Sequence, residues 1–296
     1  MTGDKVEILS VKLLSEQRKL LDEFKMVANK LRLEFGWHYL LDLAWIASHM
    51  DLDNNRRVID AGAGMGVMQW FLSNRGIDVL SVDRGSRANL PFHFRAYSPV
   101  QGLRPEDLAS RLPTAAYLLK NARSRRVKLE SLLPTVRPRT EARAEGRGTV
   151  LIYNQDLSNL TDLENNSIDA VVAVSALEHN TPEGLRIVVD EMLRVLKPGG
   201  RLLATLGAAT TEDWFHEPSK GWNYTEDSLR DIFQLDQKAS SNYAEHDQLF
   251  EELKNSQELR EGLAGFYCTA SGRGMPWGEW NPQYIPVGVC KVKSSV

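Results

Sequence analysis

Short runs of β-branched and apolar residues alternate with amphipathic segments along most of the chain, and this alternation limits the folds that it can adopt. The runs that we predict to be strands are residues 57–60, 78–83, 149–153, 168–174 and 201–206. The segments that we predict to be helices are residues 66–74 and 181–196. Strands that alternate with helices form a parallel sheet with helices on both faces. The pattern therefore predicts an α/β fold.

The two ends of the chain extend this pattern. Apolar residues recur at spacings of three and four from about Lys5 to His49, which predicts helix throughout that segment. Thr225 is the expected N-cap of a later helix, and a last strand is expected at 285–292. We therefore predict an N-terminal helical extension over residues 1–50, followed by one domain over residues 51–296.

A glycine-rich turn, DAGAGMG at residues 60–66, lies between the strand at 57–60 and the helix that follows it. Open α/β sheets bind ligands at the carboxyl ends of their strands. Glycines let the backbone turn tightly and let a ligand approach it closely. A free helix N-terminus behind them offers N–H groups to an anionic group. The turn predicts a nucleotide-type cofactor, with a purely structural turn as the alternative.

Two residues of the turn discriminate between cofactors. The dinucleotide fingerprint places glycine or alanine at its sixth position, which is Val67 in this chain. Asp60 precedes the turn, where its carboxylate would repel a pyrophosphate. S-adenosylmethionine carries an ammonium and a sulfonium and has no phosphate, so a carboxylate there is useful. The turn therefore favours S-adenosylmethionine.

At this point the chain resembles the class I methyltransferases, particularly the bacterial branch that acts on small molecules. The resemblance covers roughly residues 51–206. The blocks that carry it are DAGAGMG (60–66), VLSVDR (79–84), NQDL (154–157), IDAVVAVSALEH (168–179) and LRVLKPGGRLL (193–203). It implies a Rossmann-like, mostly parallel sheet of seven strands flanked by helices, with S-adenosyl-L-methionine as cofactor. The chain departs from the compact core of the family in a helical insertion after the second strand.

By that resemblance the strand ends supply the contacts to the cofactor. Asp60 would hold the methionine ammonium through water, and Asp83 would accept hydrogen bonds from the ribose hydroxyls. The carboxylate of Asp156 and the N–H of Leu157 would meet the adenine. The full set of cofactor-binding residues that the resemblance implies is Asp60, Gly62, Gly64, Gly66, Asp83, Arg84, Asp156, Leu157 and Ser175.

Histidines near the strand ends are candidates for the chemistry. His179 follows the strand at 168–174, on the rim where the methyl group would emerge, and would serve as general base for an alcohol or phenol. A positioning or packing role is the alternative. His216 would cap the acceptor pocket, and the segment Trp37-His38-Tyr39 would close over the cofactor. Both are weaker candidates than His179, and for the segment Trp37-His38-Tyr39 plain packing is the favoured interpretation.

Positive charge is concentrated in the insertion. Residues 84–147 carry fourteen Lys and Arg against five Asp and Glu, a net of +9, whereas the whole chain has a net charge of −3. The insertion, at about 86–148, is expected to be helical near 108–128. Its charge would suit an anionic acceptor. The alternative is that the basic side chains simply form a solvated surface. The acidic balance of the whole chain argues against nucleic-acid binding.

The cysteines and the apolar runs limit the kinds of site and the cellular location that we expect. Cys268 and Cys290 lie far apart and outside any metal-ligand spacing, so we expect neither a disulfide framework nor a metal site. The N-terminus lacks the features of a secretory signal, and no apolar run is long enough to span a membrane. We expect a cytoplasmic monomer or homodimer.

The sequence thus predicts a methyltransferase that acts on a small metabolite or sugar, with oxygen favoured over nitrogen or carbon as the methylated atom. Two other classes remain open. One is a nicotinamide-dependent oxidoreductase, which Val67 and Asp60 oppose. The other is a protein that binds S-adenosylmethionine without catalysing a reaction.

Overall fold

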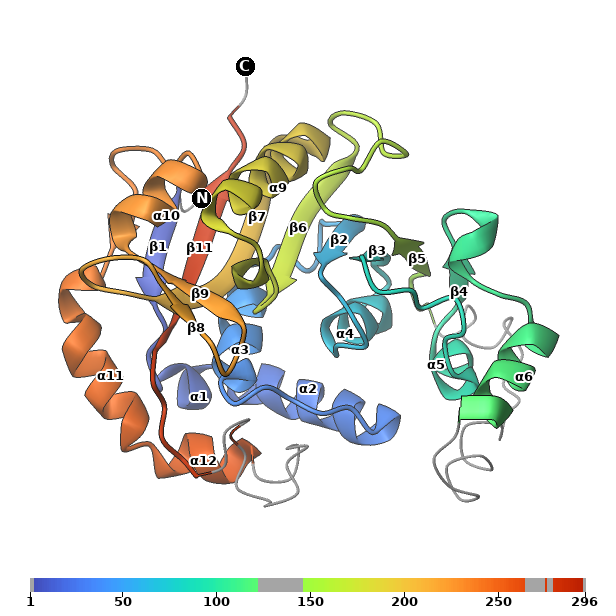
Figure 1. The fold of residues 1–296 in the computed structure, drawn as a ribbon, viewed down its shortest axis with the longest axis horizontal. Helices are drawn as coiled ribbons and strands as arrows, with labels where there is room; N and C mark the ends of the chain where they lie inside the picture. The colour runs from blue at the N-terminus through green and yellow to red at the C-terminus, as the bar shows by residue number, and fades with distance from the viewer. Residues whose placement is uncertain (1–2, 122–145, 264–274, 276–278, 295–296) are drawn as a thin grey trace.

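One mixed sheet forms the centre of the protein (Figure 1). The computed structural model describes residues 3–121, 146–263, 275 and 279–294. The eleven strands are β1 (Lys5–Ile8), β2 (Arg57–Ala61), β3 (Asp78–Asp83), β4 (Val100–Gly102), β5 (Val150–Asn154), β6 (Ile168–Val174), β7 (Leu196–Ala208), β8 (Trp214–His216), β9 (Gly221–Tyr224), β10 (Ser240–Ser241) and β11 (Pro286–Val292). Their order is β10-β1-β11-β7-β6-β2-β3-β5-β4, and β9 joins β8 to the end of β7.

The middle of the sheet is parallel, as the sequence predicts. Strands β4, β5, β3, β2, β6 and β7 run in one direction, and β11 pairs with β7 in the opposite direction. The prediction of seven strands is wrong, because β1, β4, β8, β9 and β10 extend the sheet. Each of these has only two to four residues, which is too short for a two-residue alternation to be recognised.

Helices cover the sheet on both sides. They are α1 (Leu13–Glu16), α2 (Arg18–Leu31), α3 (Tyr39–His49), α4 (Met68–Asn74), α5 (Phe92–Tyr97), α6 (Arg111–Asn121), α9 (Pro182–Val195), α10 (Glu226–Ile232), α11 (His246–Lys254) and α12 (Gln257–Leu263). In Figure 1, α9 and α10 lie toward the top of the view, and α1 to α4 lie toward the bottom. Thr225 is the N-cap of α10, as predicted, because its side chain accepts a hydrogen bond from the Ser228 N–H.

The prediction of helix from Lys5 onward is wrong at its start, because residues 5–8 form β1. Val6 and Ile8 are fully buried while Lys5 and Glu7 are only half-buried, which is the alternation of a strand. β1 lies antiparallel to β11. The next part of the predicted helix divides into α1, α2 and α3. α3 is buried on nearly all sides and packs against β6, β7 and β11.

The insertion after β3 contains α5, β4 and α6. α6 covers part of the helix expected at 108–128, and the densest basic run, 123–128, lies outside the described residues. Two of the described arginines contribute to the fold. The guanidinium of Arg95 donates to the carbonyl oxygens of Leu90 and Ala109, and that of Arg104 binds the carboxylate of Asp107. In this part of the insertion, basic residues hold loops together.

The chain order of the strands reverses between β2 and β6. From β2 the sheet continues through β3 and β5 on one side, and from β6 it continues through β7 and β11 on the other. Connections therefore diverge above the carboxyl ends of these two strands and leave a crevice between them. This is the place where open α/β sheets bind their ligands.

Candidate functional site

The glycine turn lies in this crevice and has a backbone that depends on glycine. Gly62 has φ +68° and Gly64 has φ +45°, both in the left-handed region. A Cβ atom at Gly62 would lie 2.5 Å from the Cβ of Ala176, which follows β6. The turn after β2 and the loop after β6 therefore approach more closely than any side chain at position 62 would allow.

Asp83, the last residue of β3, holds the turn from the side. Its Oδ2 accepts a hydrogen bond from the Gly64 N–H at 2.8 Å, and its Oδ1 accepts one from the Gly85 N–H at 2.6 Å. Each carboxylate oxygen keeps a second acceptor position. The carboxylate that the sequence assigns to the ribose hydroxyls therefore also fixes the backbone beneath them.

Asp60, the last residue but one of β2, carries a buried carboxylate and is 2% exposed. Its Oδ2 has no hydrogen-bond partner within the described part of the chain. Burial raises the pKa of Asp60 to about 7, and the nearby Arg87 guanidinium opposes that shift. A buried carboxylate in this state is stabilised by a cation or by a proton.

Arg87 is a site residue that the sequence reasoning missed. Its side chain is buried beneath the turn and donates to the carbonyl oxygens of Ser81 and Tyr153 at 2.6 and 3.1 Å. It thereby joins the ends of β3 and β5, and its charge acts on Asp60 and Asp83. Within a basic block, nothing in the sequence distinguished this buried arginine from the exposed ones.

Two neighbouring clefts open at these strand ends, and Gly62 lines both. The larger has a volume of about 580 Å³ and the smaller about 230 Å³. The larger is lined by Asp60, Gly62, Gly64 and Gly66, together with Tyr39 of α3. The smaller is lined by Gly62, Asp83, Arg84, Asp156, Leu157 and His179. The sequence-predicted residues other than Ser175 thus line two neighbouring clefts that share Gly62.

Asp156 lies exposed at the edge of the smaller cleft. Its Oδ1 accepts hydrogen bonds from the N–H and the hydroxyl of Ser158, and these bonds lower the pKa of Asp156. The carboxylate is therefore charged at neutral pH and is held in one orientation. Leu157 lies beside it in the same wall.

Ser175 lies between the two clefts, since Val174 lines the larger and Ala176 the smaller. Its φ of +46° is unusual for a residue with a side chain. The Ser175 hydroxyl donates to Oε1 of Glu178, whose Oε2 is buried with no partner among the described atoms. Burial raises the pKa of Glu178. The loop after β6 thus carries a second buried carboxylate.

His179 lines the smaller cleft with an exposed side chain, and its ring is fixed by the backbone. Its Nδ1 lies 2.9 Å from the carbonyl oxygen of Lys220. A carbonyl oxygen only accepts, so Nδ1 carries the proton and Nε2 has the lone pair in the neutral ring. His179 is therefore oriented as a base.

The other histidine and aromatic candidates are packed into the protein. His216 is buried, with Nδ1 bonded to the Ser219 hydroxyl and Nε2 to Oε1 of Gln283. Trp37 is also buried, and its Nε1–H donates to the hydroxyl of Tyr284. Both ring nitrogens of His216 are engaged, so it offers no base to a ligand. Packing accounts for His216 and Trp37.

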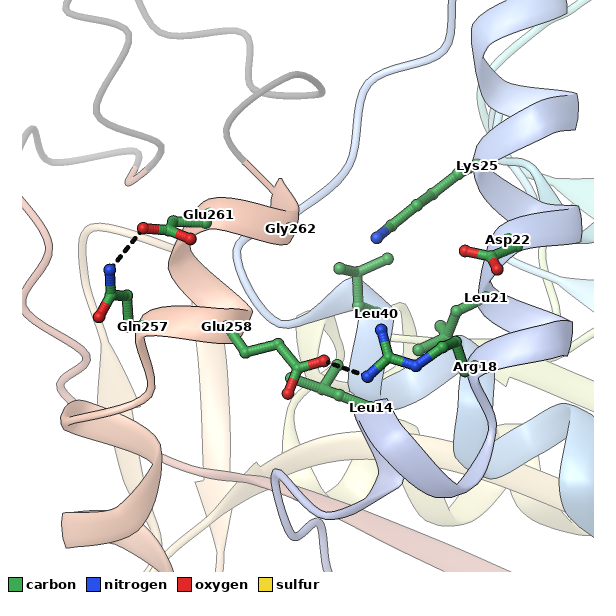
Figure 2. A pocket seen from close by; sticks show the side chains of 10 residues that line it. All are labelled: Leu14, Arg18, Leu21, Asp22, Lys25, Leu40, Gln257, Glu258, Glu261 and Gly262. Carbon is green, nitrogen blue, oxygen red and sulfur yellow. Dashed lines mark hydrogen bonds and ion pairs between the residues drawn. The ribbon is translucent and has the colours of Figure 1, made fainter.

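A separate groove of about 520 Å³ lies between α1, α2 and α12 (Figure 2). Arg18 binds Glu258 across it, and Gln257 binds Glu261 along α12. None of the sequence-predicted site residues lines it. Among the described residues there is no group of three or more metal-ligating side chains, and no helix is long and apolar enough to cross a membrane.

Comparison with solved structures gives matches of low sequence identity. The PH0226 protein from Pyrococcus horikoshii OT3 is 19% identical, with a TM-score of 0.31; the match covers 54% of this chain and 49% of that one, so this chain spans about half its length. The 1,6-didemethyltoxoflavin-N1-methyltransferase of Burkholderia thailandensis is 13% identical over 96% and 82% of the chains, with a TM-score of 0.39. The (4+2)-cyclase SpnF is 15% identical over 100% of both chains, with a TM-score of 0.49.

Sequence comparison gives a more direct result. No curated protein sequence matches the chain. The family model described as a methyltransferase domain matches residues 114–204, which include β5, β6, α9 and the first part of β7. The matched strands are the ones that complete the crevice opposite the glycine turn. Residues 114–204 are therefore similar to a methyltransferase domain.

Proposed function

We propose that the crevice binds S-adenosylmethionine in an extended form across Gly62. The adenosine part occupies the smaller cleft, where Asp83 accepts from the ribose hydroxyls and Asp156 and Leu157 meet the adenine. The methionine part passes over the glycine turn into the larger cleft, toward Asp60. Arg84 and Ser175 border this path.

One observation carries the proposal. The Oδ2 atom of Asp60 is buried without a partner in the described structure, at the end of the cleft where the methionine ammonium would lie. A buried unpaired carboxylate is costly, and an ammonium, directly or through one water, would remove that cost. A pyrophosphate at this position would add a negative charge beside it, which opposes a nicotinamide cofactor.

When bound, S-adenosylmethionine supplies an activated methyl group, and the protein has to align an acceptor with it. The reaction is an in-line displacement at carbon, so the main contribution of the protein is positioning. His179, with Nε2 unprotonated, lies on the rim of the cleft and takes the proton that the acceptor releases. The acceptor is a small molecule, in keeping with a larger cleft of about 580 Å³.

Isothermal titration with S-adenosylhomocysteine tests the cofactor assignment. The wild type should bind, and Asp83→Ala should weaken binding at least about tenfold, because two charge-assisted hydrogen bonds are lost. Asp247→Ala is the matched control, since that carboxylate is 95% exposed on α11 and outside both clefts. Absence of binding by the wild type, or unchanged binding by Asp83→Ala, would refute the assignment. Release of S-adenosylhomocysteine with an acceptor mixture separates an enzyme from a binding protein.

A further inference from the structure

The carboxamide of Gln69 lies against the glycine turn. Gln69 is the second residue of α4, is 1% exposed and lines neither cleft. Its two amide hydrogens are shared among three carbonyl oxygens of the turn. Nε2 lies 3.1 Å from the oxygen of Gly66, 3.3 Å from that of Gly64 and 3.4 Å from that of Ala63. One buried side chain therefore holds these carbonyls on the side of the turn that faces away from the clefts.

Hydrogen-bond chemistry fixes which way round this carboxamide lies. Carbonyl oxygens only accept, so the nitrogen of the Gln69 amide has to face the turn and its oxygen has to face the opposite way. There the hydroxyl of Ser81, on β3, donates to Oε1 at 2.6 Å. Arg87 donates to the same hydroxyl through Nη1, and because an arginine cannot accept, the hydroxyl hydrogen is left for Gln69. The bonds thus run in one direction, from Arg87 through Ser81 and Gln69 to the turn.

These bonds orient two peptide groups of the turn. In a trans peptide the C=O and the N–H that follows it point in opposite directions. The peptide between Ala63 and Gly64 is held from both sides, because its C=O meets Gln69 while its N–H donates to Oδ2 of Asp83 at 2.8 Å. The next peptide also has its C=O on Gln69, so the N–H of Met65, which lines the larger cleft, points away from Gln69. Gln69 thereby fixes which backbone groups the turn presents to the clefts.

We propose that Gln69 is a positioning residue for the cofactor. The inference rests on the proposed function, in which Asp83 accepts from the ribose hydroxyls while the N–H of Gly64 holds its carboxylate in place. Gln69 aims that N–H by holding the carbonyl on the other side of the same peptide. A buried carbonyl without a donor is costly, so without the carboxamide the peptides of the turn would rotate toward water in the crevice. The cofactor would then bind more weakly, although Gln69 has no contact with it.

Gln69→Met and Ser73→Ala, both on α4, are the matched substitutions. Methionine has nearly the length of glutamine but no N–H donor, so the Kd of S-adenosylhomocysteine in isothermal titration should rise at least about tenfold. Ser73 is fully buried too, lines neither cleft, and donates from its hydroxyl to the carbonyl oxygen of Gly148 at 2.7 Å. Ser73→Ala should lower the melting temperature but leave the Kd within about twofold. The melting temperature also verifies that each variant is folded.

Ser81→Ala separates positioning from packing. It removes the hydroxyl that orients the carboxamide, at a position that lines neither cleft. Alone it should raise the Kd about threefold or more, and in the Gln69→Met protein it should have no further effect, because the bond that it supports is already absent. Independent packing defects would instead add. Should Gln69→Met not fold, Ser81→Ala decides alone, and an unchanged Kd would overturn the inference.

Hydrogen exchange in the protein without cofactor tests the orientation of the turn separately. With nitrogen-labelled glycine, the N–H of Gly64 should exchange at least about tenfold faster in Gln69→Met than in the wild type. The N–H of Gly148 donates to the carbonyl oxygen of Ser73 at 2.9 Å, and its exchange should be unchanged. Unchanged exchange at Gly64 would show that Gln69 does not hold this peptide.

The outcomes distinguish this inference from the proposed function. If the wild type binds S-adenosylhomocysteine and folded Gln69→Met binds it equally well, Gln69 has no positioning role and the cofactor assignment stands. Equal losses of binding in Gln69→Met and Ser73→Ala would also overturn the inference, since any buried defect on α4 would then suffice. If the wild type does not bind S-adenosylhomocysteine, the proposed function fails and the inference fails with it.

Discussion

Asp60 should make cofactor binding depend on pH. Its pKa of about 7 means that the carboxylate is increasingly protonated below neutrality. An ammonium binds the carboxylate and not the neutral acid, so the Kd of S-adenosylhomocysteine should rise about tenfold for each pH unit below 7 and level off above it. Titration calorimetry between pH 5.5 and 8.5, roughly spanning that value, measures this. In Asp60→Asn the dependence should disappear; a slope that persists in this variant would show that another group is responsible.

Without cofactor, Asp60 should make the free energy of unfolding decrease as pH rises, whereas cofactor binding should become stronger. In the unfolded chain the pKa of an aspartate is about 3.9. Between that value and about 7 the folded protein therefore holds a proton that the unfolded chain has released. The contribution of Asp60 to the free energy of unfolding thus falls as pH rises through this window. A cofactor ammonium reverses the balance, so bound cofactor should stabilise the protein most above pH 7.

Gly62→Ala should abolish the close approach between the turn and the loop after β6. The substitution combines a positive φ with a contact of 2.5 Å to the Cβ of Ala176. Gly199→Ala is a matched control, because Gly199 has φ +77° but its added Cβ would meet nothing within 4 Å. Both should lose about 1 kcal/mol to backbone strain, and only Gly62→Ala should weaken S-adenosylhomocysteine binding by tenfold or more, by about 1.4 kcal/mol. Equal binding losses in the two variants would contradict the argument.

At the scale of single residues, the sequence predicted side chains whose position follows from a strand end. Asp60, Asp83 and Asp156 lie at or near the carboxyl ends of β2, β3 and β5, which are neighbours in the sheet, so their convergence follows from a parallel sheet. Arg87 could not be predicted in this way. Its role depends on burial and on partners from distant segments, and spacing along the chain carries no information on either.

Arg87 links elements and should matter more to stability than any exposed arginine. It bonds carbonyl oxygens of β3 and β5 beneath the glycine turn, and its charge is balanced by Asp83 and Asp60. Arg87→Met would leave those carbonyls and carboxylates without a cation, at a cost of about 3 kcal/mol. Urea unfolding measures the loss. Arg111→Met, at the exposed start of α6, should change stability by less than about 0.5 kcal/mol.

At the scale of elements, the length of each strand decided whether the sequence could predict it. β3 and β6 lie at the bounds expected from the sequence, since six or seven consecutive apolar-rich residues give a clear pattern. β1 was missed because four residues with two buried positions also fit the spacing of the helix that follows. β4, inside the insertion, has three half-buried residues and no alternation to detect.

For the whole molecule, the edge of the sheet beyond β11 is completed by the start of the chain. Pairing of β1 with β11 brings Val6, Ile8 and Leu9 into the core, each fully buried. Sequence order gives no hint of this, because residues 5–8 and 286–292 are almost a chain length apart. The crevice above β2 and β6, where we propose that the cofactor binds, is separated from β1 by β11 and β7. Stability and cofactor binding therefore depend on separate parts of one sheet.

A chain that begins at Ser10 tests this separation. Loss of three buried apolar side chains removes about 5 kcal/mol, and it exposes the edge of β11, which is open to pairing with other chains. The melting temperature should fall by about 10 °C or more, with aggregation on heating, whereas deletion of residues 1–3 alone should have little effect because Gly3 is exposed. At low temperature the folded fraction should still bind S-adenosylhomocysteine with nearly unchanged Kd. A truncated protein that melts like the wild type would mean that β1 contributes little to the core, and a folded protein that has lost binding would mean that the two ends of the sheet are coupled.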